Sequence, residues 1–417
     1  MKINNSILLK HSHNIFFQNN FKILKNLSAI FIIFAVFTIT RQFPLNLYGF
    51  SGTPKFFIIL GFLFGFPLIL KNLIYSKNKT IVLLSFCMLI IICIHSLYSL
   101  FTTANPLGVL RFFFILILII LAYYLKLPKY FVNWFYLFTI LQSLFLIIFE
   151  IYLVFFSSPS ERVIIRQFFL NYHLGDVYTY NNYFFRIQIL GNPLIPVAFF
   201  LSVYSKKNII IKIILFLGVL ISANFAFYIA TFLFLVGYYT FMKAKNNLKL
   251  INNFIKIFTV IILTLYPMMK YVNYILSKKA HSMSVRCDQF NVLINDMSGS
   301  ILTILFGKGL GHIVNVRTSF RDYSKSYYFE LQTIYVLNQL GLLAFIYYFA
   351  ILFIAYNLYQ KEIFYIYLCY IIYAITNPYI LDVTHIVVIL TLNILNNRRK
   401  YEFRKSLCNN YYVQAEN

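Results

Sequence analysis

Arginine and tyrosine side chains in two polar segments, 157–188 and 270–330, are the residues of this sequence best suited to bind a charged substrate. A guanidinium group binds phosphate oxygens through paired hydrogen bonds, and a tyrosine ring can stack against a sugar. Any one of these arginines could simply contact lipid headgroups, but the whole set favours a phosphate-bearing substrate. The arginines are Arg162, Arg166, Arg186, Arg286, Arg317 and Arg321, and the tyrosines include Tyr327 and Tyr328.

Glu330 is the acidic residue best placed to take a proton from a substrate hydroxyl. It lies where the second polar segment meets an apolar run. A carboxylate at such a helix entry can act as a general base, or it can simply interact well with the positive end of the helix dipole. Earlier in the same segment, Gly307, Gly309 and Gly311 fit either a flexible turn or a close approach to substrate.

Charged and polar residues in or near the apolar runs form a further group of candidates. Arg111 and Glu150 are two of them, because charges within a membrane are functional by default, although these two could also pair with each other. Asp382 and His385 stand at the start of the last apolar run and are candidates for lining a cavity. A single histidine in that position is more often a structural hydrogen-bonding residue.

The sequence lacks several motifs that would identify a common catalytic class. It contains no Walker A loop, no glycine-rich dinucleotide motif, no HExxH and no GxSxG, which argues against an ATPase or a zinc protease. His173 and His281 have no cysteine nearby, and the five cysteines show no CxxC spacing. We therefore expect neither a metal ion nor a cofactor.

The composition places these polar residues in a membrane protein. Of the 417 residues, 61% are hydrophobic and only 11% are charged, whereas a soluble domain is about half apolar and about a quarter charged. A soluble globule could not bury 48 Phe and 35 Tyr together with so many Ile- and Leu-rich runs. The composition excludes a soluble enzyme or a nucleic-acid-binding protein. In a membrane protein, the net charge of +25 mainly reflects the topology of the chain.

The apolar runs predict an all-α polytopic integral membrane protein with about twelve transmembrane helices. A helix that crosses a bilayer needs roughly 17–25 apolar residues. Most of the 36 Lys and Arg residues lie in segments that the positive-inside rule assigns to the cytoplasm, which places both termini there. The predicted spans are 25–40, 56–72, 81–101, 108–125, 130–156, 189–205, 208–223, 224–242, 252–269, 331–358, 362–377 and 379–396.

The spans and the two polar segments divide the chain into six parts. Spans one to five occupy 1–156, spans six to nine 189–269, and spans ten to twelve 331–396. The first polar segment (157–188) and the second polar segment (270–330) are long outer loops, and 397–417 form a basic cytoplasmic tail. Long loops are usually functional or disordered, and the aromatic content of these two predicts order. Residues 298–312 could form a short helix on the membrane surface.

The order of motifs in these segments resembles the O-antigen polymerase and ligase family. After Arg286 the sequence reads CDQFNVLINDMSGSILTILFGKGLGH, which contains a spaced FGxGxG. After Glu330 it reads LQTIYVLNQLGLLAF at the entry of a span. Upstream, Arg186 is followed by IQILGNPLIPVAFF with an Asn-Pro pair, and a second Asn-Pro pair lies at 377–378. The resemblance covers about residues 160–380.

The resemblance implies a polymerase of the Wzy type. Ligases of the family carry a histidine eleven residues before the glycine of the LGL turn, where this sequence has Glu330 before Gly341. A polymerase would join undecaprenyl-pyrophosphate-linked oligosaccharide repeat units at the periplasmic face of the bacterial inner membrane, in lipopolysaccharide O-antigen synthesis. Its expected partners are that lipid-linked substrate, the bilayer and a chain-length regulator protein.

The same resemblance implies a role for each candidate residue. Glu330, Arg286 and Arg186 would be catalytic: the carboxylate would take the acceptor proton, and the two arginines would neutralise the leaving pyrophosphate. This glycosyltransferase would be metal-independent, because arginine supplies the positive charge. The substrate-binding set would be Arg162, Arg166, Arg317, Arg321, Tyr327 and Tyr328.

Three other functions compete with polymerisation. A lipid-linked oligosaccharide flippase would have short outer loops, paired halves and charges near the bilayer midplane, and this sequence shows the reverse. An O-antigen ligase is disfavoured by Glu330. A non-enzymatic scaffold would leave the clustered arginines unexplained.

Overall fold

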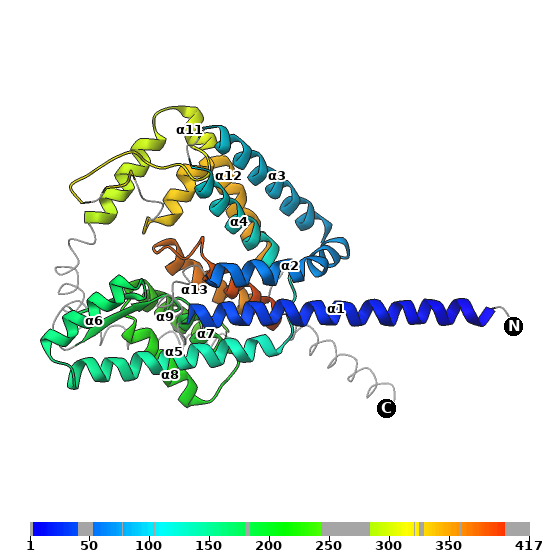
Figure 1. Cartoon of the computed structure of the whole chain (residues 1–417), viewed down its shortest axis with the longest axis horizontal. Coiled ribbons are helices and arrows are strands. Elements are labelled where there is room, and N and C mark those ends of the chain that lie inside the picture. The colour runs from blue at the N-terminus through cyan, green and yellow to red at the C-terminus, as the bar shows by residue number, and fades with distance from the viewer. Residues whose placement is uncertain are drawn as a thin grey trace.

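The computed structural model is mostly helical (Figure 1). It describes the backbone of residues 3–40, 53–76, 78–102, 105–179, 184–242, 284–320, 322–324, 329–357 and 360–396. Side chains are described over the same ranges except for 3–19, 241 and 354–357. The predicted span 252–269 and the predicted basic tail lie outside these residues, as do Arg321, Tyr327 and Tyr328.

The first part of the chain forms five helices separated by short connections. Each of them is rich in apolar residues. In the core of a bilayer, where no water is available, the hydrogen bonds within a helix satisfy its backbone N–H and C=O groups. Ser28 fixes the first two helices to each other by donating to the carbonyl of Gly61 at 2.7 Å. The helices are α1 (Ile3–Ile39), α2 (Thr53–Ile74), α3 (Lys79–Thr102), α4 (Pro106–Ala122) and α5 (Tyr130–Phe155).

The first polar segment folds into an amphipathic helix and a β-hairpin. Helix α6 (Pro159–Asn171) begins with a capping box, in which the side chains of Ser158 and Glu161 bond each other's backbone N–H groups. The hydrogen bond from the Ser158 amide holds the pKa of the Glu161 carboxyl below its usual value. Strands β1 (Gly175–Thr179) and β2 (Phe185–Ile189) pair antiparallel. The structure thus places one helix and one hairpin in a segment that the sequence predicted only as an ordered loop.

The second half of the chain contains shorter helices and one broken helix. Helix α12 has a non-helical residue inside it, Gly341, with φ 73°. The elements are α7 (Leu194–Tyr204), α8 (Ile209–Ile221), α9 (Phe225–Gly237), the π-helical turn η2 (Tyr238–Met242), a helix over 284–297, α11 (Ile301–Phe306), α12 (Gln332–Asn357), α13 (Lys361–Ile375) and Val383–Asn396, the last helix within the described residues, which is called the final helix below.

Each of the eleven predicted spans that fall within the described residues overlaps one of these helices. By length and composition, five helical stretches within the described residues are long and apolar enough to cross a membrane. Five further apolar helices are shorter, among them α4, α8 and Val383–Asn396. These properties are those of a helical membrane protein. The five long stretches are Asn20–Ile39, Thr53–Ile74, Lys79–Thr102, Tyr130–Phe155 and Gln332–Phe353.

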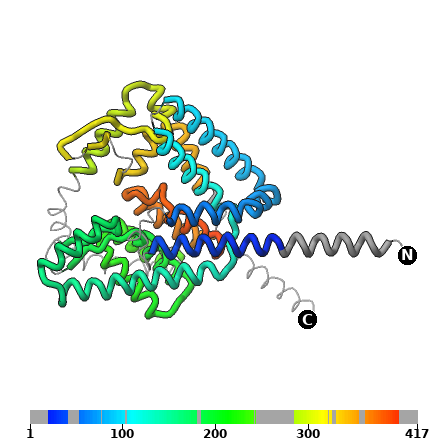
Figure 2. The backbone as a smooth tube through the Cα atoms, in the orientation of Figure 1, coloured from blue at the N-terminus to red at the C-terminus, as the bar shows by residue number. Residues whose placement is uncertain are grey.

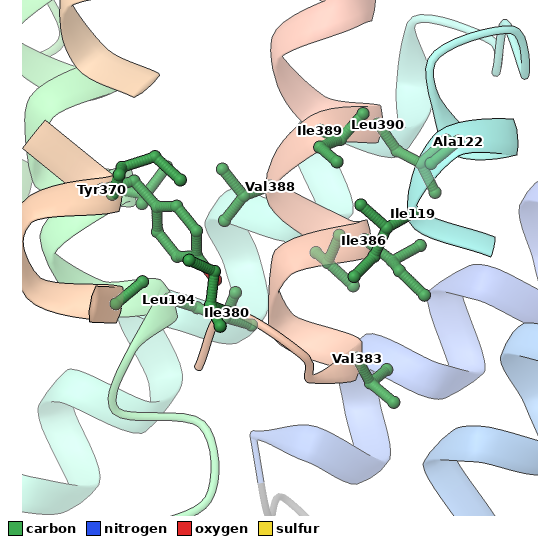
Figure 3. Close-up of a cluster of buried hydrophobic side chains, with 14 of the residues drawn as sticks. Ile119, Ala122, Leu194, Tyr370, Ile380, Val383, Ile386, Val388, Ile389 and Leu390 are labelled. Atoms are coloured by element: carbon green, nitrogen blue, oxygen red, sulfur yellow. The ribbon is translucent and has the colours of Figure 1, made fainter. Parts of the chain in front are cut away.

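The final helix, Val383–Asn396, lies in the interior of the molecule, and each of its residues is buried. Figure 3 shows Val388 directed toward Tyr370 of α13, and Leu390 directed toward Ala122 of α4. The amide of Asn393 adds hydrogen bonds to the carbonyls at the end of α4, at 2.9 and 3.1 Å. Because lipid is as apolar as these side chains, close packing and such hydrogen bonds hold the helix in place.

The backbone trace separates the helices into two groups around this centre (Figure 2). Helices α5 to α9, drawn in green, gather with α1 on one side. Residues 284–320, drawn in yellow, gather with α3, α4 and α12 on the other. The two polar segments therefore belong to different groups of helices.

Candidate functional site

Arg286 and Glu330 form an ion pair between two elements of the second polar segment. The Nε of Arg286, on the helix over 284–297, donates to Oε2 of Glu330 at 2.9 Å. Each side chain is 34% exposed, so the pair is accessible from outside the protein. Both residues were predicted from sequence to be catalytic. The structure brings them into direct contact although they lie 44 positions apart in the chain.

Gln289 fixes the position of this pair. It lies one helical turn after Arg286 and is fully buried. Its Oε1 accepts from the backbone amides of Glu330 at 3.0 Å and Leu331 at 3.3 Å. Those amides stand at the start of α12, where helix donors need an external acceptor. Gln289 thus attaches the helix over 284–297 to the beginning of α12 and sets the register between Arg286 and Glu330.

Stacked aromatic rings support the region around Glu330. The ring of Tyr323 stacks on that of Phe329, and the ring centroids of Phe329 and Tyr335 lie 4.5 Å apart. The ring of Tyr335 in turn meets that of Phe112 on α4 edge to face. The hydroxyl of Tyr323 also donates to Asp288 at 2.8 Å. This chain of rings joins the second polar segment to the membrane helices, so the residues around Glu330 are held by packing as well as by charge.

The glycines of the FGKGLG sequence have a structural role. Gly307 (φ 79°, ψ 178°) and Gly341 (φ 73°, ψ 169°) both adopt backbone conformations that are essentially restricted to glycine. A Cβ on Gly307 would lie 2.3 Å from the carbonyl oxygen of Gln339, and one on Gly341 would lie 2.3 Å from the amide nitrogen of Gly307. The two glycines allow the loop to dock against the break in α12, which gives Gly307 a structural reason to be glycine.

Asp296 joins this docked loop to α12. Its Oδ2 lies 3.0 Å from Nε2 of His312 and accepts from Asn338 at 2.8 Å. Burial alone would raise the pKa of Asp296, but the hydrogen bonds from His312 and Asn338 outweigh it, with help from the charges of His312 and Lys308. The pKa therefore lies below its usual value. The sequence did not single out this group.

The predicted short helix within 298–312 is α11, which is six residues long. Ser300 and Thr303 form its capping box. Ile301, Leu302 and Phe306 are between 53% and 75% exposed, which gives the element an uncovered apolar surface. That exposure is what a helix on a membrane surface requires.

The arginines of the first polar segment form a separate cluster around the hairpin. Arg166 binds Asp176 through two nitrogens, at 2.9 and 3.3 Å. Arg162 donates to Ser157 at 2.9 Å and lies over the ring of Phe185. The hairpin register places Arg186 opposite Tyr178, whose hydroxyl accepts its Nη1. Sequence and structure agree that these three arginines share one segment.

The predicted catalytic set is divided between the two clusters. Arg186 belongs to the hairpin, whereas Arg286 and Glu330 belong to the second polar segment. The elements that carry them lie apart in Figure 1, with α6 and the hairpin beside α5 and the helix over 284–297 near α12. Arg317 is exposed and forms an isolated backbone bridge with Asp322.

Glu150 and the two Asn-Pro pairs hold the hairpin and the interior helices. Oε1 of the buried Glu150 accepts the backbone amide of Phe185 at 2.8 Å, so Glu150 supports the hairpin and is not paired with Arg111. Asn192 donates to the Ile187 carbonyl at 2.8 Å, and Asn377 donates to the Tyr373 carbonyl at 2.9 Å.

His385 is a structural hydrogen-bonding residue rather than a group that lines a cavity. It is fully buried. One ring nitrogen lies 2.8 Å from the Ile380 carbonyl and the other 3.1 Å from the Tyr367 hydroxyl. Both nitrogens are therefore engaged within the protein.

A cavity of about 260 Å³ lies between α2, α4 and the start of the final helix. Lys55, Arg111 and Asp382 line it, together with Gln332, which follows Glu330 by two positions. Gln332 accepts the amide of Leu381 at 2.9 Å. Arg111 and Asp382 were separate candidates from sequence, and Lys55 was not a candidate. One feature of the sequence could have linked the three charged residues: each lies at or near the outer end of a predicted span.

Within the described residues, no group of three or more His, Cys, Asp or Glu side chains is arranged to hold a metal ion. Comparison with known proteins finds no matching family model, no similar curated protein and no similar solved structure. The geometry of the site itself therefore carries the functional argument.

Proposed function

We propose that this chain is a membrane-embedded glycosyltransferase that polymerises oligosaccharide units carried on polyprenyl pyrophosphate. The observation that carries the proposal is the partly exposed Arg286–Glu330 ion pair, positioned by Gln289 at the start of α12. An acid and a cation in contact match the two demands of this reaction, which are removal of a hydroxyl proton and neutralisation of a departing pyrophosphate.

The reaction transfers the glycan of one lipid-linked unit to another. The terminal hydroxyl oxygen of the acceptor unit forms a bond with the anomeric carbon of the donor. The bond between that carbon and the pyrophosphate oxygen breaks, and its electron pair leaves with polyprenyl pyrophosphate. The Glu330 carboxylate takes the hydroxyl proton, and its attraction for Arg286 then weakens. The guanidinium becomes available to the pyrophosphate at the moment when charge develops there.

The topology that we propose puts this chemistry outside the cytoplasm. About twelve spans, with both termini inside, place both polar segments and the entries of α2, α4 and α12 on the outer, periplasmic face of a bacterial inner membrane. The lengths and composition of the apolar helices support a membrane-spanning protein, and the orientation follows from the distribution of Lys and Arg. In this proposal the cluster of Arg162, Arg166 and Arg186 binds phosphate or glycan of a second substrate molecule, at a distance from the reacting bond.

Surface polysaccharide from a strain that lacks the gene tests the proposal. We expect lipid A-core with a single repeat and no ladder, and restoration of the ladder by the wild-type gene. Core without any repeat would instead indicate a flippase, and accumulation of lipid-linked polymer would indicate a ligase. An unchanged ladder would contradict a role in this pathway.

Site variants then test the ion pair. Glu330→Gln should reduce polymerisation by about 10²–10⁴-fold, which is the usual contribution of general acid–base catalysis. Arg286→Ala should reduce it by about 10²–10³-fold, which is the usual cost of losing one group that stabilises transition-state charge. Membrane insertion should stay normal in both variants. Glu362→Gln is the matched control, because Glu362 is an acid in the first turn of α13. If Glu362→Gln reduced activity as much as Glu330→Gln, an effect on helix ends would explain the loss and the proposed role of Glu330 would fail.

A further inference from the structure

The cavity between α2, α4 and the final helix combines charge with a mostly apolar wall. Lys55 and Arg111 contribute two positive charges, and Asp382 contributes one negative charge. Most of the other lining side chains are aliphatic or aromatic, including Ile386, which lies next to Ile119 of α4 in Figure 3. Charges at an apolar surface are expensive unless a partner compensates them.

The charges within the protein do not balance. Lys55 interacts electrostatically with both Arg111, which repels it, and Asp382, which attracts it. Asp382 accepts the hydroxyl of Thr384 at 2.9 Å, and among the described residues it forms no ion pair with either cation. One positive charge therefore remains at the cavity, and an anion between the two cations would relieve their repulsion.

The wall of the cavity continues onto the lipid-facing surface of α2 and α4. Leu107 is 79% exposed, Leu110 45%, Phe114 48% and Ile59 39%. In a membrane such exposed apolar side chains face acyl chains. The cavity volume of about 260 Å³ is close to the lower end of ligand pockets, at about 300 Å³. It can hold a headgroup and part of a chain, and the rest of a long chain would follow the exposed wall.

We infer that this cavity binds the phosphate group of a membrane lipid, with Lys55 and Arg111 as its cationic contacts and the lipid chain along α4. Arg111 lies in the second turn of α4 and Lys55 in the first turn of α2, so both cations stand near one end of their helices. The exposed apolar wall of α4 gives the lipid a lateral route to them from the bilayer. The inference does not depend on polymerase activity, because lipid binding is measurable without turnover.

Native mass spectrometry of the purified full-length protein in detergent tests the inference. The probes are a long-chain polyprenyl phosphate, the corresponding polyprenol without phosphate, and a dioleoyl phosphatidic acid. Lys55→Met and Arg111→Met should each weaken phosphate-lipid binding about tenfold, and the double variant about a hundredfold, as expected for charge-assisted hydrogen bonds. Asp382→Asn should strengthen binding, because it removes the negative charge beside the phosphate.

Two further variants separate binding from folding. Lys212→Met removes a cation from the apolar helix α8, outside the cavity, and should leave binding unchanged. The pair Lys55→Arg with Arg111→Lys keeps both charges and should retain most of the affinity. Stronger binding of polyprenyl phosphate than of phosphatidic acid would identify a polyprenyl ligand, and equal binding would identify a general phospholipid site.

Two results would overturn the inference. One is equal binding of polyprenol and polyprenyl phosphate to the wild type. The other is that Lys55→Met, Arg111→Met and Lys212→Met all bind as the wild type does. Loss of the polysaccharide ladder with normal lipid binding in Glu330→Gln would leave both proposals standing, whereas normal lipid binding together with an intact ladder in that variant would remove the polymerase role alone.

Discussion

At the scale of single residues, Asp296 shows how one partly buried carboxylate can attach a loop to a helix. Its oxygen serves both His312 of the loop and Asn338 of α12. Because its side chain is only 18% exposed, solvent cannot replace these hydrogen bonds. The geometry therefore depends on Asp296 being ionised.

Asp296→Asn should destabilise the protein at neutral pH by about 1–3 kcal/mol, the cost of losing hydrogen bonds to a charged group. The folded-state pKa lies below the ordinary value of 3.8, so Asp296 stabilises the fold above that value. The stabilisation is lost as the pH falls through the folded-state pKa. Thermal unfolding in detergent between about pH 7 and pH 3 should show the gap between wild type and variant closing below pH 3.8. A constant gap would contradict the assignment.

The residue types of the site were predictable from sequence, but their partners were not. Arg286 and Glu330 could be chosen because an arginine in a polar segment and an acid at a helix entry suit phosphate and proton chemistry. Their contact depends on Gln289, which has no distinguishing sequence signal. Likewise, Lys55, Arg111 and Asp382 come from helices far apart in the chain, and only the packing of α2 and α4 against the final helix brings them to one cavity.

At the scale of elements, the docking of the FGKGLG loop into the break of α12 depends on two glycines in close backbone contact. Gly307→Ala and Gly341→Ala should each lower stability by at least about 2 kcal/mol, since the backbone conformation alone costs about 1–3 kcal/mol with a side chain. The measurement is thermal unfolding of the purified variants. Gly299→Ala is the control, because a Cβ there meets no atom within 4 Å.

If Gly307→Ala and Gly341→Ala were as stable as Gly299→Ala, the close contact between loop and helix would not contribute to the fold. If they were unstable yet still formed a ladder, docking of the loop would be structural only. Hydrogen exchange at residues 301–312 would then show whether the loop had left α12.

The helices were predictable because long apolar runs have few alternatives in a membrane, whereas the hairpin was not. The predicted span 189–205 begins in the structure only at Leu194, because Ile189 pairs with Gly175 in the sheet. Strands of five residues give too short an alternation to stand out beside apolar spans. Their support also comes from outside the segment, from Glu150 on α5.

At the scale of the whole molecule, the exposed cysteine of the second polar segment can report the proposed topology. Cys287 is exposed and lies in the second polar segment. A membrane-impermeant maleimide should label it in intact spheroplasts, and Cys287→Ser should abolish that labelling. Cys408, in the predicted cytoplasmic tail, should react only after permeabilisation. Labelling of Cys287→Ser in intact spheroplasts would place the tail outside and invert the proposed orientation.

The interior position of Val383–Asn396 has a consequence for biosynthesis. This helix leaves the ribosome after every other helix described, yet it fills the space between α4 and α13. Until it arrives, the surrounding helices have inserted but lack their shared neighbour, and lipid chains can occupy its place. We expect this helix to expel those chains when it packs between α4 and α13, so its insertion would exchange lipid for protein rather than add a peripheral helix.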